Sequence, residues 1–176
     1  MNVDLLEGVQ RAIVRTPNRF CAAQWAFARN AEAVLREGAV PDGFRCCIAG
    51  HVLLEGGTHS ERDLLRAGGF HTGGELWVEA ARHASICSEQ GRELFFPSQW
   101  DRPFKRQYYL CGREAEAALA ADYLDYFLEK YGPDLDRSVG GFGEPERERD
   151  RAASVPTSRA QDSAAGSKPA EARLSA

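Results

Sequence analysis

The chain has 176 residues, with 22 Lys and Arg against 26 Asp and Glu, which gives a net charge of −4. This acidic balance, without any basic stripe, argues against nucleic acid as the main partner. No apolar run approaches the length of a membrane span, and the N-terminus lacks a signal-peptide pattern. Five cysteines without a regular framework indicate reduced thiols, so we predict a cytoplasmic protein that does not contact membranes.

Composition divides the chain into a folded part, residues 1–136, and a tail, residues 137–176. The folded part contains every Trp and Tyr and all but one Phe, and it is long enough to bury a core. The tail is rich in Gly, Pro, Ser and Ala, with nearly equal numbers of basic and acidic residues. Such a segment cannot bury enough apolar surface to offset its ordering entropy, so we predict a disordered polyampholyte tail.

Apolar residues recur at helical spacing along most of the folded part, which predicts a compact all-α domain of about six helices. We expect helices over residues 4–15, 22–36, 45–55, 61–67, 75–86 and 113–131, and a further short helix over residues 88–96. Ser60 is a suitable N-cap for the helix at 61–67, and Ser88 can cap the short one. Proline and glycine mark the ends of the first and last helices, at Thr16-Pro17 and Gly132-Pro133.

The most unusual stretch spans residues 44–57 and combines two adjacent cysteines, a histidine and a run of aliphatic residues. A helix with so little polar surface is expected to be central and buried on most sides. Gly50 costs this helix about 1 kcal/mol relative to alanine. We therefore predict that another helix or a bulky side chain approaches closely at Gly50, with Trp25 and Trp77 as candidates.

Several short motifs occur in an order that resembles a family of small uncharacterised proteins from bacteria and their phages. The motifs are Asn18-Arg19-Phe20 with Trp25, Cys46-Cys47-Ile48-Ala49-Gly50-His51, Leu94-Phe95-Phe96 with Trp100, and Tyr126-Phe127-Leu128. In that family the Cys-Ile-Ala-Gly segment is usually followed by Trp or His, as it is here by His51. A Cys-Gly-Thr turn often precedes the segment, whereas this chain has Pro41-Asp42-Gly43. The resemblance covers roughly residues 18–131 and implies a small helical fold, without a known activity.

Cys47 is a candidate nucleophile, with His51 or His71 as its base. A thiol near a helix N-terminus is stabilised as thiolate, and an adjacent imidazole would assist, which is the chemistry of a thiol hydrolase or transferase. The alternative is simple packing, because buried cysteine behaves as a small inert hydrophobic residue.

A metal site is the second candidate. Cys47 and His51 are four residues apart, and so are His83 and Cys87, so two such pairs on facing helices could form a Cys2His2 zinc site. The spacing lacks the close ligand pairs typical of structural zinc, so semi-polar core packing is the competing interpretation.

A partner-binding surface is the third candidate, on the loop at residues 96–104. Trp100 stands between charged residues and prolines, which suggests exposure, and Arg102 and Phe104 adjoin it. An exposed aromatic beside a basic residue is typical of protein interfaces.

These observations together favour a non-catalytic accessory or regulatory module that contacts a still unidentified protein partner and needs no cofactor. The alternative is a Cys/His-dependent enzyme or a zinc protein centred on Cys47 and His51.

Overall fold

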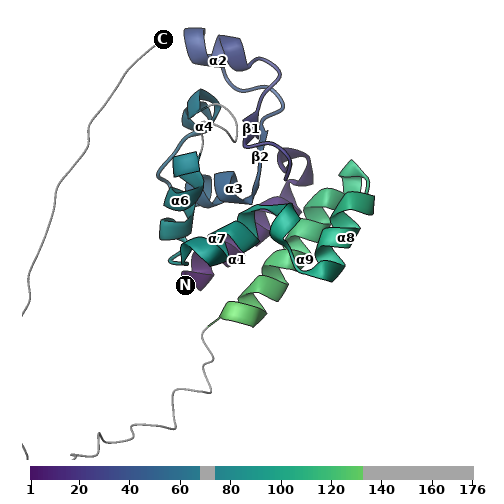
Figure 1. Cartoon of the computed structure of the whole chain (residues 1–176). Helices are drawn as coiled ribbons and strands as arrows, with labels where there is room; N and C mark the ends of the chain where they lie inside the picture. The colour runs from purple at the N-terminus through teal and green to yellow at the C-terminus, as the bar shows by residue number, and fades with distance from the viewer. Residues whose placement is uncertain (68–73, 133–176) are drawn as a thin grey trace, which may run out of the picture. The chain divides into compact units, whose positions relative to one another are not determined.

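The computed structural model describes residues 1–67 and 74–132 (Figure 1), which all lie within one compact unit, Met1–Ser138. These residues form eight α-helices, two 3-10 turns and one two-stranded sheet, so the predicted all-α class is confirmed. The tail predicted at residues 137–176 lies outside the described residues. The elements in chain order are α1 (Val3–Arg15), η1 (Pro17–Arg19), β1 (Ala26–Phe27), α2 (Ala31–Glu37), β2 (Arg45–Cys46), α3 (Ile48–Glu55), α4 (Glu61–Ala67), α6 (Gly74–His83), α7 (Ser88–Phe95), η2 (Pro97–Gln99), α8 (Arg102–Leu110) and α9 (Arg113–Tyr131).

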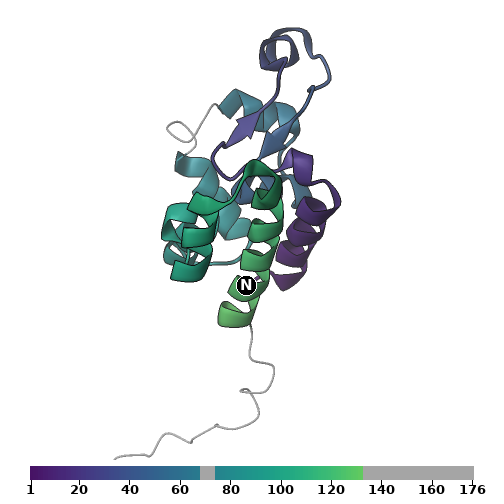
Figure 2. The same cartoon turned by 90° about the vertical axis from the view of Figure 1, so that its right-hand side faces the viewer.

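Helix α1 begins where expected because Asn2 caps it. The side-chain oxygen of Asn2 accepts a hydrogen bond from the Leu5 N–H at 3.2 Å, which satisfies a backbone donor that the first turn leaves free. One face of α1 is buried against α9 and α3, and Figures 1 and 2 show α1 (purple) beside α9 (green) in both views. The buried side chains of α1 are Leu6, Val9, Ala12 and Ile13.

Helix α3 occupies the centre of the domain, as predicted, since every residue from Ile48 to Leu53 is buried. A Cβ added at Gly50 would lie 2.8 Å from the Cβ of Cys46 and 3.3 Å from the carbonyl oxygen of Trp25. The predicted close approach at Gly50 is therefore confirmed. The predicted partner is wrong, because the backbone of Trp25 and the small Cys46 side chain approach Gly50, rather than another helix or a tryptophan ring.

The helix predicted over residues 22–36 is wrong in its first half, and the helix predicted over 45–55 is wrong at its start. β1 and β2 instead pair in antiparallel fashion, with Ala26 opposite Cys46 and Phe27 opposite Arg45. Of the helix predicted over residues 22–36, only α2 forms. It lies between β1 and β2 in the chain, and Figure 2 shows it at the end of the hairpin where the chain turns back. Pairing between distant segments overrides the helical propensity of the alanine-rich segment, because propensity differences are only about 1 kcal/mol or less per residue.

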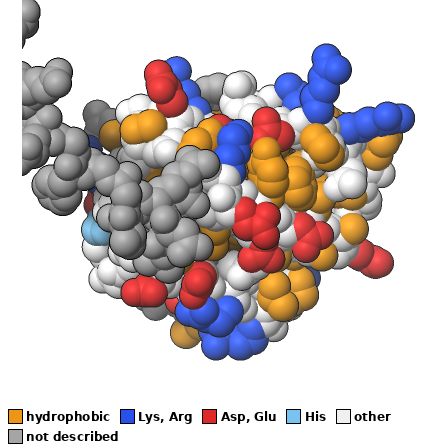
Figure 3. All heavy atoms as spheres, turned by 90° about the horizontal axis from the view of Figure 1, so that it is seen from below, with side chains coloured by type: hydrophobic (Ala, Val, Ile, Leu, Met, Phe, Trp, Pro, Cys, Tyr) orange, Lys and Arg blue, Asp and Glu red, His pale blue; other side chains and the backbone are white. Residues whose placement is uncertain are grey.

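The remaining predicted helices lie close to their expected positions. Ser60 caps α4 as predicted, since its hydroxyl accepts a hydrogen bond from the Asp63 N–H at 3.3 Å. The N-cap of α7 is Cys87 rather than Ser88. Among the described helices, none has both the length and the apolar character needed to cross a membrane. On the face seen from below, acidic and basic side chains are interspersed among hydrophobic ones (Figure 3).

Candidate functional site

Cys47 and His51 lie in the hydrophobic core. Cys47 is the N-cap of α3, and its carbonyl oxygen accepts the first helical hydrogen bond, from the His51 N–H at 3.0 Å. Only 1 % of Cys47 and 5 % of His51 is exposed, and the His51 ring stacks on Phe20 with centroids 6.1 Å apart. The second predicted base, His71, lies outside the described residues.

Burial controls the protonation of both groups. Burial raises the pKa of the Cys47 thiol to about 11, although hydrogen bonds from nearby backbone N–H groups oppose the shift. Burial also lowers the pKa of His51 to about 4. At neutral pH the thiol is therefore protonated and the imidazole is neutral, and neither is accessible to a substrate. These properties favour packing, one of the two interpretations that the sequence leaves open for Cys47.

The four predicted zinc ligands do not come together. His83 lies on α6 with its Nε2 3.8 Å from a Glu79 carboxylate oxygen, and Cys87 is exposed at the start of α7. Cys47 and His51 belong to the core. Within residues 1–67 and 74–132, no group of three or more His, Cys, Asp or Glu side chains could hold a metal ion.

The predicted exposure of Trp100 is wrong, because only 3 % of this residue is exposed. Its ring stacks on Tyr123 with centroids 4.4 Å apart, and its Nε1–H donates to the Leu94 carbonyl at 3.1 Å. Phe104 is half-buried against the Tyr123 ring at 5.1 Å, whereas Arg102 is exposed at the start of α8. The expected loop at residues 96–104 is largely the turn η2 and the first residues of α8.

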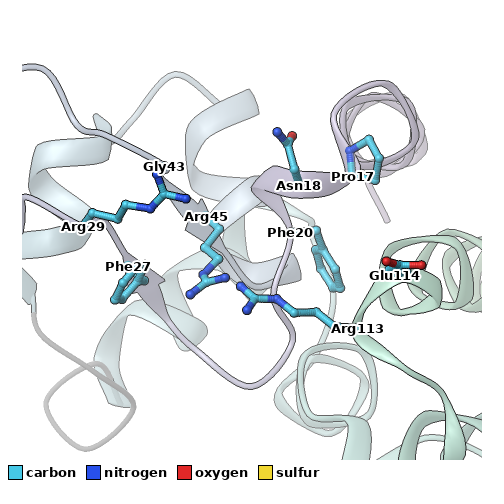
Figure 4. A pocket seen from close by; sticks show the side chains of 9 residues that line it. All are labelled: Pro17, Asn18, Phe20, Phe27, Arg29, Gly43, Arg45, Arg113 and Glu114. Carbon is cyan, nitrogen blue, oxygen red and sulfur yellow. The ribbon is translucent and has the colours of Figure 1, made fainter.

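A cavity with a volume of about 800 Å³ lies between the hairpin, η1 and the N-terminus of α9 (Figure 4). Arginines come from three different elements or loops, and two phenylalanines complete the apolar walls. Figure 4 shows the guanidinium groups of Arg45 and Arg113 pointing toward each other across the opening. The lining residues are Pro17, Asn18, Phe20, Phe27, Arg29, Gly43, Arg45, Arg113 and Glu114. We call this cavity the arginine cleft.

Strand register positions Arg45 in the arginine cleft. Arg45 and Phe27 are directly opposite each other in the sheet, so their side chains project from the same face. The Arg45 guanidinium carbon lies 4.4 Å from the centroid of the Phe27 ring, a cation–π contact that holds the side chain in place. The Nε of Arg45 is buried and has no hydrogen-bond partner among the described residues. A buried donor without an acceptor lowers the stability of the fold.

Arg113 reaches the arginine cleft from the first residue of α9. Gly112, the N-cap of this helix, provides no side-chain acceptor, so the positive end of a 19-residue helix lies beside the guanidinium. The nearest buried acid, Glu116, accepts a hydrogen bond from the Ala22 N–H at 3.0 Å. Burial raises the pKa of Glu116, although Arg113 and this hydrogen bond lower it. Glu116 is thus engaged with the backbone of the segment before β1.

Arg29 forms the outer edge of the arginine cleft. It stands 3.8 Å from Asp42 in an exposed ion pair, an interaction of little strength in water. Gly43, at φ +62°, turns the chain beside the Arg29 side chain. Within the part of the chain that the structure describes, Arg45 and Arg113 form no ion pair with any carboxylate. The arginine cleft therefore concentrates positive charge on a domain that is acidic as a whole.

Such an arrangement can bind a carboxylate or phosphate, because planar guanidinium groups donate paired hydrogen bonds to these anions. Among the described residues that line the cleft, the exposed carboxylate of Glu114 is the one candidate for a nucleophile or general base. The arginine cleft is not evident in the sequence, because its residues are distant in the chain. The Phe44-Arg45 start of the unusual central stretch was the only local signal.

Comparison with protein-family models, curated proteins and solved structures gives no match for this chain.

Proposed function

We propose that this protein is a non-catalytic binding module that recognises an anionic group of a partner molecule in the arginine cleft. The observation that carries the proposal is the convergence of Arg45 and Arg113 in an open cavity without a carboxylate partner among the described residues. Two guanidinium groups repel each other unless an anion lies between them, so a bound anion relieves this repulsion.

The accessory or regulatory role inferred from the sequence agrees with this proposal, since a binding module needs no catalytic group. All five cysteines are free, which suits a protein of the reducing cytoplasm.

The proposal is tested by titrating N-acetyl-diglutamate into ¹⁵N-labelled protein and following the arginine Nε–H resonances. We expect saturable shifts of the Arg45 and Arg113 signals, which weaken as salt is added, because the cleft is open to solvent. The neutral analogue N-acetyl-diglutamine is expected to leave both signals in place.

Variants assign the effect to the arginine cleft. Arg113→Gln, at an exposed first-turn position, is expected to weaken diglutamate binding by about tenfold or more, since a hydrogen bond to a charged group contributes about 1.5–3 kcal/mol. Arg45→Gln is expected to do the same. Arg82→Gln removes one positive charge from the exposed side of α6 and is the matched control. Equal effects of all three variants, or shifts without saturation, would refute the proposal.

A further inference from the structure

The arginine cleft adjoins two smaller hollows. It shares Arg45 and Arg113 with a smaller hollow lined by Cys21, Ala23, Gln24 and Glu116. That hollow in turn shares Arg113 and Glu116 with one bounded by Tyr108, Tyr109 and Cys111. Because neighbouring hollows have lining residues in common, they adjoin one another across the start of α9, and we call this row of hollows the groove. A groove that extends past its charged centre is suited to a linear chain rather than to a compact small molecule.

The far end of the groove is aromatic. Tyr108 is anchored against Trp100, with ring centroids 5.7 Å apart, and Tyr109 packs edge-on against Tyr108 at 5.4 Å. Tyr109 is nevertheless 64 % exposed. An anchored ring beside an exposed one offers a preformed apolar contact surface for a side chain of a partner.

Building on the proposed function, we propose that the ligand of this groove is an extended peptide segment of a partner protein. It places an acidic residue between Arg45 and Arg113, and an apolar side chain on Tyr108 and Tyr109. Gln24, exposed between the two ends, offers its side-chain amide to a peptide group of the ligand.

Charge distinguishes a short acidic peptide from a nucleic acid. A nucleic acid carries one charge per phosphate along its whole length, and it binds through extended basic surfaces. Here the basic residues that line the groove are Arg29, Arg45 and Arg113, and Glu114 and Glu116 lie among them, so the groove offers no extended basic surface. A ligand with one acidic end and one apolar end complements this arrangement.

The test uses two fluorescein-labelled peptides, Glu-Glu-Gly-Ser-Leu-Leu and Glu-Glu-Gly-Ser-Ser-Ser, each also synthesised in reverse order because the groove does not define chain direction. Fluorescence anisotropy is expected to show about tenfold tighter binding of one leucine peptide than of its serine counterpart, the effect of burying about one aliphatic side chain. Tyr109→Ser is expected to abolish this difference and to leave the affinity for the serine peptides unchanged. Val14→Ser, which removes another exposed apolar side chain on α1, is the matched control and should preserve the difference.

The outcomes separate this inference from the proposed function. Equal affinities for leucine and serine peptides, both lost in Arg113→Gln, would refute the peptide assignment and leave anion binding in place. A leucine preference that survives Tyr109→Ser would also refute it. Failure of every peptide and of N-acetyl-diglutamate to bind would overturn both proposals. Binding of a single-stranded oligonucleotide in preference to all four peptides would replace the peptide with a nucleic acid.

Discussion

The buried imidazole of His51 makes the stability of this protein dependent on pH in a defined way. His51 is 5 % exposed, and its Nε2 has no hydrogen-bond partner among the described residues. Burial is the main cause that lowers its pKa from 6.5 to about 4, and the positive charge of Arg19 acts in the same direction. A hydrogen bond with the Arg19 backbone opposes the shift but does not cancel it. Protonation of this side chain is therefore much easier in the unfolded chain than in the folded one.

The magnitude follows from the two pKa values. Above pH 6.5 the imidazole is neutral in both states, and its pKa difference has no effect on the free energy of unfolding. As the pH falls from 6.5 toward 4, the unfolded state binds a proton that the folded state does not, so stability is lost. The loss amounts to about 2 kcal/mol at pH 5 and about 3 kcal/mol at pH 4.

The measurement compares wild type with His51→Phe, which keeps an aromatic ring against Phe20. Urea unfolding at pH 7.5 and pH 5.0 gives the free energy of unfolding of both proteins. Carboxylates that both proteins share contribute equally to the two values, so their contribution cancels in the difference between the proteins. We expect His51→Phe to gain about 2 kcal/mol relative to wild type when the pH falls from 7.5 to 5.0. An unchanged difference between the two proteins would refute the reasoning. So would an NMR titration of the folded protein in which the His51 imidazole titrates near pH 6.5.

Three further predictions concern packing and thiol reactivity. Gly50→Ala gains up to about 1 kcal/mol of helix propensity, but its Cβ lies within 3 Å of Cys46. We therefore expect urea unfolding to show a net loss of about 1 kcal/mol in the free energy of unfolding. A gain in this free energy would show that Cys46 moves aside easily. Trp100→Ala is expected to lower the free energy of unfolding by about 3–5 kcal/mol, and a loss below about 1 kcal/mol would contradict its burial. Cys87, which is exposed, is expected to react quickly with a chromogenic disulfide reagent in native buffer, whereas Cys47 reacts only after unfolding. Rapid labelling of Cys47 in native buffer would support the interpretation of Cys47 as a nucleophile. Labelling of Cys47 only after a chelator is added would support the zinc-site interpretation.

Local patterns in the sequence predicted the helical class, the central position of α3 and the cap at Ser60. Each of these depends on neighbours within one or two turns, because periodic apolar residues define a buried face and a cap acts on the adjacent turn. The close approach at Gly50 was also predictable, since glycine destabilises a helix interior and is favoured there only where a larger side chain would clash with a neighbour. The same local patterns wrongly placed Trp100 at the surface. Its neighbours in the chain are charged residues and prolines, and they do not indicate that the ring of Tyr123, on a distant helix, covers it.

The arginine cleft depended on the tertiary structure alone. Phe27 and Arg45 meet only because two short strands pair, and that pairing replaced part of a helix that propensity favoured. Arg113 joins them from the first turn of α9, far along the chain, where the sequence shows only an ordinary helix start. Likewise, the neutrality of Cys47 and His51 follows from their burial, not from their spacing. The sequence therefore determined most of the helical segments and their apolar faces, because these are properties of neighbouring residues. Folding decided which charges converge and which thiols are buried, because charge interactions and desolvation depend on distances between segments that are remote in the chain.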